Sequence, residues 1–173
     1  MVVTPFHVGF VWPLYAKFKG KLDFSVLTIA SMVPDLEIPV LMLLTNGETG
    51  RLVLHSIAGG ILMGIPLTLL IAFGLFGKIN WAWFRRFNLN FEFLKPQNRL
   101  ISKPVIVSAF IGIMSHVIVD VFMMHGLNAS PLFWPFSGKT IAILLFNNAF
   151  LSPALMHLLA IALILRSVKK LQK

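Results

Sequence analysis

Long apolar runs separated by short polar segments are the main pattern along this chain. Three of them cover residues 22–44, 52–76 and 104–125, and shorter apolar stretches cover 2–18 and 141–166. A helix needs about 20 mostly apolar residues to cross the hydrocarbon of a bilayer, and the three long runs reach that length. The pattern predicts an all-α polytopic membrane bundle of about four to five transmembrane helices, with a short or re-entrant N-terminal helix.

The first long run is interrupted near its middle by two prolines and two acidic residues. Pro34 and Pro39 flank Asp35 and Glu37. A proline inside a helix removes one backbone hydrogen bond and clashes with the preceding turn. We therefore expect this helix to be kinked or broken around an acidic centre.

Two connections between the runs have distinctive compositions. Residues 126–139 are turn-rich yet apolar, which is typical of a re-entrant or lid loop over a cavity, because irregular backbone at membrane depth is tolerated only there. Residues 78–103 hold Trp81, Trp83 and several basic residues, which is typical of a cytoplasmic or interfacial segment. We expect residues 1–173 to form a single integral membrane domain.

Composition supports this interpretation and predicts the direction of the chain. The sequence is 57% hydrophobic and 12% charged, with a mean hydropathy of +0.85. If the runs alternate across the bilayer, 13 of the 15 Lys and Arg residues fall on one side, which the positive-inside rule makes cytoplasmic. We therefore expect a multi-pass protein of the cell (inner or plasma) membrane, with a cytoplasmic C-terminus and no nucleic-acid partner. The absence of cysteine excludes thiolate metal ligands.

Candidate chemistry begins with His116 and Asp120, which lie inside the third long run. Residues four apart share one face of a helix, so the two side chains project together. Ionisable groups at membrane depth are costly and normally face a protein interior or a wet cavity, which makes them functional candidates. A His and an Asp one turn apart can also form half of a metal site.

Three further ionisable residues fall at a similar depth. With a helical rise of about 1.5 Å per residue, Asp35, His116 and Asp120 lie roughly 14, 14 and 8 Å from the outer ends of their runs. His55 and His7 fall on the same side. We expect these five side chains to form one polar site toward the outer leaflet. Each has a simpler alternative, since a buried His is commonly a packing residue and Asp35 could cap a broken helix.

Histidine and carboxylate ligands without sulfur suit Zn first, with Mn, Fe or Mg as alternatives. Three protein ligands and an open position are typical of catalytic sites. We therefore predict a divalent ion held by His55, His116 and Asp120, with His7 and Asp35 completing the site. Asp35 is the candidate catalytic carboxylate.

Residues next to these candidates have less specific interpretations. Glu37 would point away from the site on a regular helix, although at a break it could turn in as a base. Ser56 and Ser115 stand beside the two candidate histidines and could orient them. His125 and His157 are interpreted as loop, supporting or packing residues.

Five short motifs follow one another along the chain: Thr4-Pro5-Phe6-His7, Pro34-Asp35, Leu54-His55-Ser56, His116-x-x-x-Asp120 and Trp134-Pro135-Phe136. In this order they resemble the YdjM-like family of predicted membrane-bound metal-dependent hydrolases, and its archaeal members that open with Thr-Pro-Phe-His in particular. The resemblance implies a polytopic inner-membrane protein with metal ligands at His7, Asp35, His55, His116 and Asp120. Bacterial members carry His-Arg-Gly-x-x-His-Ser at the third motif, whereas this chain reads Gly50-Arg51-Leu52-Val53-Leu54-His55-Ser56.

These observations favour a metal-dependent hydrolase in the lipid bilayer that acts on a phosphate or ester bond of a lipid-like substrate. A small transporter or a proton or ion conduit would use the same His and Asp residues. At this length a transporter would need to dimerise, so an oligomer stays open. A non-enzymatic membrane scaffold, in which the polar groups only join helices, is the third alternative.

Overall fold

The computed structural model describes residues 4–48, 50–79, 86, 95–123, 129–143 and 151–171. Within these ranges the regular elements are all helical and no strand is present. Two are short 3-10 helices (η1 and η2) and two are π-helical segments (η3 and η4). In chain order the elements are η1 (Thr4–His7), α1 (Val8–Lys17), α2 (Phe24–Ala30), η2 (Val33–Leu36), α3 (Glu37–Leu44), α4 (Ile57–Gly59), η3 (Gly60–Gly64), α5 (Ile65–Leu69), η4 (Leu70–Phe76), α7 (Lys103–Met123) and α8 (Leu151–Leu171).

Two helical segments are long and apolar enough to cross a membrane, Ile57–Phe76 and Lys103–Phe122. The bent pair Phe24–Ala30 and Val33–Leu44 makes a third candidate if it counts as one span. α8 contains a shorter apolar stretch, Pro153–Ser167, and α1 has only 10 residues, which agrees with a short N-terminal helix. The described residues thus form an all-helical bundle with two to three candidate spans, fewer than the predicted four to five.

The first long run is broken next to Pro34, around the predicted acidic centre, while Pro39 lies inside α3. α2 ends at Ala30, a 3-10 turn over Val33–Leu36 follows, and α3 continues at an angle of 43°. Asp35 lies in that turn and its side chain is buried. The break therefore places a carboxylate in the interior of the bundle.

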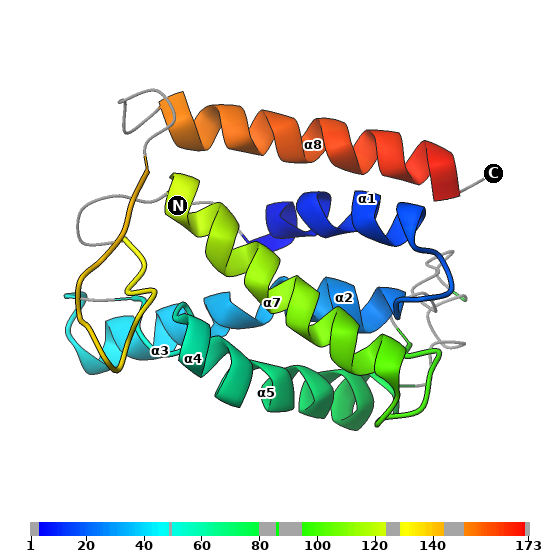
Figure 1. Ribbon diagram of the computed structural model, residues 1–173, viewed down its shortest axis with the longest axis horizontal. Helices are drawn as coiled ribbons and strands as arrows, with labels where there is room; N and C mark the ends of the chain where they lie inside the picture. The colour runs from blue at the N-terminus through cyan, green and yellow to red at the C-terminus, as the bar shows by residue number, and fades with distance from the viewer. Residues whose placement is uncertain are drawn as a thin grey trace.

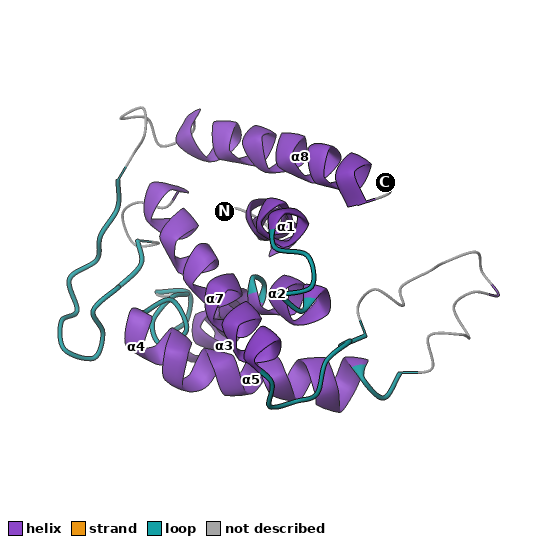
Figure 2. Cartoon of the chain, turned by 45° about the vertical axis from the view of Figure 1, so that its right-hand side comes forward, coloured by secondary structure: helices purple, strands orange, loops and turns teal. Residues whose placement is uncertain are grey.

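α7 is the central helix, and α2 runs beside it in the same direction (Figures 1 and 2). Asp23 N donates to Ser108 Oγ at 2.8 Å, and His116 Nδ1 lies 2.7 Å from Ser31 O, so both pairs are 85 residues apart in sequence. Gly112 lies midway between these contacts, and a Cβ atom there would come within 2.7 Å of Leu27 O. The small residues Ser108 and Gly112, four positions apart on α7, thus let the two helices approach closely.

The remaining helices pack on either side of this pair (Figures 1 and 2). α8 lies along α1, where a Cβ at Gly9 would come within 2.5 Å of Ala160 O. The helical run that starts at Ile57 packs on α7, and a Cβ at Gly60 or Gly64 would meet Ile113 at 2.9 or 3.0 Å. Close helix approach explains these small residues.

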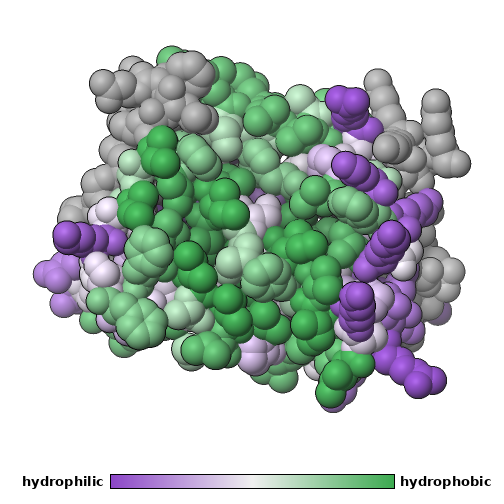
Figure 3. Space-filling view, in the orientation of Figure 1, coloured by the Kyte–Doolittle hydropathy of each residue, from purple (hydrophilic) through white to green (hydrophobic). Residues whose placement is uncertain are grey.

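Figure 3 shows hydrophobic residues over the middle of one face of the molecule, with hydrophilic residues at its two ends. The exposed large hydrophobic residues come chiefly from the outer helices and include Leu43, Leu62, Leu70 and Leu158. An apolar belt between polar ends is what a bilayer requires of the surface that it contacts.

Residues 129–143 include much of the predicted lid loop. Leu132 O accepts a hydrogen bond from Ile57 N at 3.0 Å, and Ile143 N donates to Val121 O at 2.7 Å. Leu132 also packs against a buried cluster that contains Ala30 and Val117. This segment therefore returns to the bundle interior beside the start of α4.

Candidate metal centre

The five ionisable side chains predicted to converge lie together inside the bundle. They come from four parts of the chain: η1, the turn η2, the segment before α4, and α7. None is more than 8% exposed. Two overlapping sets of three have ligand atoms within 4.8 Å of one another: His7, His116 and Asp120, and Asp35, His55 and His116.

Two imidazoles form the centre of this cluster. The Nε2 atoms of His55 and His116 lie 3.4 Å apart. Asp35 Oδ1 lies 3.6 and 3.4 Å from them, and Asp120 Oδ2 lies 3.3 and 3.6 Å from them. The centre of a triangle with sides of this length is about 2.0 Å from each corner, which matches Zn–N and Zn–O bonds. Either carboxylate oxygen therefore completes a three-ligand set of the right size.

Glu37 holds His55 in place. Its Oε1 lies 2.7 Å from His55 Nδ1 and accepts a hydrogen bond from Leu52 N at 2.8 Å, while Oε2 accepts from Leu54 N at 2.8 Å. The break in the helix turns this side chain inward, as one of the two sequence alternatives allowed. Its oxygens are engaged by the backbone and by His55, so the carboxylate orients a ligand and is not placed as a base.

The acceptor that orients His116 is a backbone carbonyl. His116 Nδ1 lies 2.7 Å from Ser31 O, just beyond the end of α2. From the sequence, Ser56 and Ser115 were the residues that could orient the neighbouring His55 and His116. Ser56 instead caps α4, because its Oγ accepts from Gly59 N at 3.0 Å and donates to Val53 O at 2.7 Å.

These contacts fix the direction of the lone pairs. Nδ1 of each histidine faces an oxygen acceptor, so it carries the hydrogen, and Nε2 keeps its lone pair when the ring is neutral. Two such lone pairs 3.4 Å apart repel each other unless a cation or a proton lies between them. Burial by itself lowers the pKa of His55, but hydrogen bonds to Asp120 and Asp35 raise it overall to about 10. The metal-free site thus retains a proton where a metal ion would fit.

His7 covers the cluster from η1. Its ring stacks on His116 with centroids 3.8 Å apart, and its Nε2 lies 3.6 Å from Asp120 Oδ1. Burial, together with the neighbouring His116, lowers the pKa of His7 to about 3. Neither ring nitrogen has a hydrogen-bond partner among the described residues. His7 therefore offers a neutral nitrogen to an additional ligand.

Arg51 is the site residue that sequence reasoning missed. Its Nε donates to Asp120 Oδ2 at 3.1 Å, and both side chains are at most 1% exposed. The sequence placed Arg51 among the charges of an outer loop, because a turn precedes it and an apolar run follows. Its position four residues before His55 was the available signal.

The charges of the cluster favour a divalent cation. With neutral histidines, the carboxylates of Asp35, Glu37 and Asp120 and the guanidinium of Arg51 leave two uncompensated negative charges. Buried charge without compensation is costly, whereas one divalent ion would neutralise the site. His and carboxylate donors without sulfur suit Zn, and also Mn or Fe.

The family model described as YdjM inner membrane protein matches residues 4–172, almost the whole chain. The chain belongs to the YdjM inner membrane protein family. This confirms the resemblance seen in the five motifs. Neither the curated proteins nor the solved structures contain a match. Family membership and the apolar helices together make this a membrane protein.

Of the two other histidines of this YdjM-family protein, only His157 lies in the described residues, and it is outside the cluster. His157 Nδ1 lies 2.7 Å from Pro153 O, one turn earlier in α8, and its ring meets Phe6 edge-on. It is a packing residue, as predicted. His125 lies outside the described residues.

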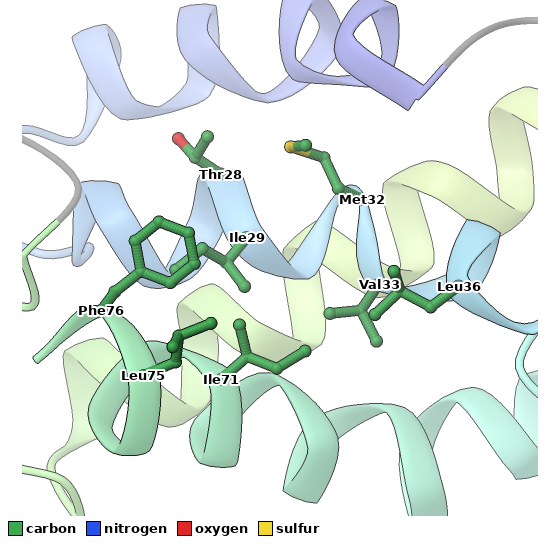
Figure 4. Close-up of a pocket in the computed structure, with 8 residues that line it drawn as sticks. All are labelled: Thr28, Ile29, Met32, Val33, Leu36, Ile71, Leu75 and Phe76. Atoms are coloured by element: carbon green, nitrogen blue, oxygen red, sulfur yellow. The ribbon is translucent and has the colours of Figure 1, made fainter. Parts of the chain in front are cut away.

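Two apolar cavities flank the broken helix of the YdjM-family protein. One of about 400 Å³ lies between α2, η2 and η4 (Figure 4), and Met32, Val33 and Leu36 form its wall next to the Asp35 turn. The other, of about 370 Å³, is lined partly by Leu36 and Glu37. Both are almost wholly apolar, so they suit hydrocarbon chains better than polar groups.

Proposed function

We propose that this YdjM-family protein is a metal-dependent hydrolase that acts on a phosphate or ester bond of a lipid-like substrate. One observation carries the proposal: the Nε2 atoms of His55 and His116 face each other at 3.4 Å, while Nδ1 of each ring is held by an oxygen acceptor. Metal-binding histidines characteristically have such acceptors. A divalent ion between the two Nε2 atoms would take the place of the proton that the metal-free pair retains there.

His55, His116 and Asp120 would hold the ion, with Asp35 and His7 completing the site. A bound divalent ion would supply a water of lowered pKa and would polarise an oxygen of the substrate. Asp35 Oδ2 has no hydrogen-bond partner among the described residues, so we assign it the proton of the attacking water. The water oxygen bonds to the phosphorus or carbonyl carbon, the bond to the alcohol oxygen breaks, and the alcohol leaves with that proton.

A lipid-like substrate is supported by the surroundings of the site. The two apolar cavities of about 400 and 370 Å³ lie against the turn that carries Asp35 and beside Glu37. Their exposed rims include Leu36 and Leu75, which belong to the apolar surface that a bilayer would cover. A hydrocarbon chain bound there would lie beside the catalytic groups.

We further propose the full membrane arrangement on the strength of the basic residues. In it, residues 1–173 form a single membrane domain of four to five spans in the inner membrane, with the connection over 78–103 and the C-terminus in the cytoplasm. The metal centre then lies toward the outer leaflet. The short apolar stretch of α8, Pro153–Ser167, would span the membrane with flanking basic residues reaching the interface.

A proton or ion conduit is the second candidate, and a specific contact supports it. Asp120 bridges His7, at 3.6 Å from Oδ1, and His55, at 3.3 Å from Oδ2. Linked ionisable groups of this kind relay protons in membrane pumps.

The test is elemental analysis of the purified protein beside its His116→Ala/Asp120→Ala variant, with His157→Ala as a matched control outside the cluster. We expect nearly one Zn, Mn or Fe per chain in the wild type and in the control, and none in the double variant. Hydrolysis of lipid phosphates or esters by the loaded wild type would then separate the hydrolase from a conduit. Equal metal content in all three proteins would overturn the metal site.

A further inference from the structure

Arg51 extends the metal centre toward a particular class of substrate. We propose that its guanidinium binds a phosphoryl oxygen of the substrate, so that the bond hydrolysed is a phosphate ester and not a carboxylic ester. The inference rests on the proposed metal centre and deepens it. Phosphate binding would also explain why a buried arginine lies next to the site of a metal cation.

The geometry comes from one carboxylate oxygen. Asp120 Oδ2 lies 3.1 Å from Arg51 Nε, 3.3 Å from His55 Nε2 and 3.6 Å from His116 Nε2. An ion bonded to this oxygen at about 2 Å lies within about 5 Å of the guanidinium. A phosphate with one oxygen on the ion would have a second oxygen close enough to be bound by Arg51.

The chemistry of the arginine side chain favours phosphate as the ligand. A guanidinium is permanently charged and presents a planar fork of donors that matches two oxygens of one phosphate. A carboxylic ester is neutral and offers a single carbonyl oxygen, which the metal would occupy. A second cation beside the metal would then have no partner on that substrate.

The simpler alternative is that Arg51 only stabilises Asp120. That role predicts that removing the guanidinium weakens metal binding or folding and has no separate effect on anions. The substrate role predicts that metal content is retained while phosphate affinity falls. Measuring zinc binding and phosphate binding separately distinguishes these two roles of Arg51.

The experiment compares zinc-loaded wild type, Arg51→Met and Arg51→Lys in detergent by calorimetric titration with inorganic phosphate and with acetate. Zinc content and thermal unfolding are recorded for each. We expect both variants to keep zinc, and Arg51→Met to bind phosphate at least about 30-fold more weakly, which corresponds to roughly 2 kcal/mol, with acetate affinity unchanged. Arg51→Lys keeps the charge without the fork and should be intermediate, so it decides the question if Arg51→Met does not fold.

Titration with a short-chain phosphatidic acid shows whether the bound phosphate belongs to a lipid headgroup or to a soluble phosphate ester. Tighter binding than inorganic phosphate, with the same dependence on Arg51, indicates a lipid headgroup, whereas equal affinity indicates a soluble phosphate ester. Phosphate affinity that is the same in the wild type and both variants, with zinc retained, would overturn the role of Arg51 alone. A wild type that binds no zinc would overturn the metal centre and this inference together.

Discussion

Glu37 Oε1 lies 2.7 Å from His55 Nδ1 and also accepts hydrogen bonds from the backbone just before that histidine. The carboxylate thus fixes both the ring and the chain that carries it. It lies only two residues after Asp35, so the broken helix supplies a candidate ligand and the support of another ligand in one short turn.

Replacing Glu37 by Gln should therefore weaken metal binding and leave the ligand set intact. A glutamine cannot accept on both sides of its amide, so either His55 or the Leu54 amide loses its partner. We expect zinc affinity to fall by about 10- to 100-fold, measured by competition with a chelator. Glu48→Gln, at an exposed position, is the control, and equal affinities for both variants would contradict the orienting role.

Metal affinity should rise with pH. The pKa of His55 in the metal-free protein is raised to about 10, so below that pH the metal must displace a proton from the ring. For one displaced proton we expect about a tenfold gain in affinity per pH unit between about pH 6.5 and 9. Titrations in two buffers of different ionisation enthalpy would count the released protons, and an affinity independent of pH would exclude His55 as a ligand.

Asp23, at the N-terminal end of α2, should contribute strongly to the free energy of unfolding. Its buried carboxylate accepts from Ser25 Oγ and Val26 N on Oδ1, and from the amides of Gln97 and Asn98 on Oδ2. Replacing it by Ala leaves these donors without an acceptor, which should cost about 3 kcal/mol or more.

Thermal unfolding in detergent would measure this cost. Asp23→Asn retains one acceptor oxygen and should lose less than Asp23→Ala. Equal unfolding temperatures for wild type and Asp23→Ala would show that the connection at Gln97 is held by other contacts.

Gly112 tests the close approach of α2 and α7. A Cβ there would come within 2.5 Å of Ala30 Cβ, so Gly112→Ala should force the helices apart and destabilise the protein by about 1–3 kcal/mol. Because Ser31 O orients His116, zinc affinity should fall as well. Gly74→Ala is the matched control, since its Cβ would meet only Leu70 Cδ1 at 3.5 Å; a similar loss in both variants would point to a general helix effect.

The sequence predicted the parts of the fold and site that depend on local rules. Pro34 located the break, because a proline removes a backbone hydrogen bond and clashes with the preceding helical turn, whereas Pro39 lies in the first turn of α3. The four-residue spacing placed His116 and Asp120 on one face. Counting helical rise along separate runs then brought His7, Asp35 and His55 to the same depth, and the structure brings all five side chains together.

Other features depend on contacts that no local rule specifies. Glu37 turns inward because the geometry at the break differs from a regular helix, and the choice between its two alternatives needed the structure. Ser31 orients His116 through a backbone carbonyl, which leaves no trace in residue type. Arg51 was read as a loop charge because its partner, Asp120, is 69 residues away.

The contacts at the two ends of α2 both join residues that are 85 apart in sequence, so α2 runs parallel to α7 without a shift in register. α2 thereby connects two ends of the molecule. At one end, the Asp23 carboxylate accepts hydrogen bonds from the Gln97 and Asn98 amides. At the other end, the Ser31 carbonyl is hydrogen-bonded to the imidazole of His116. Every residue of α2 between these ends is buried, so α2 cannot bend without disturbing the packing of the helices around it. A displacement of the backbone at Gln97 and Asn98 would therefore be transmitted along α2 to the carbonyl of Ser31, which orients the imidazole of His116.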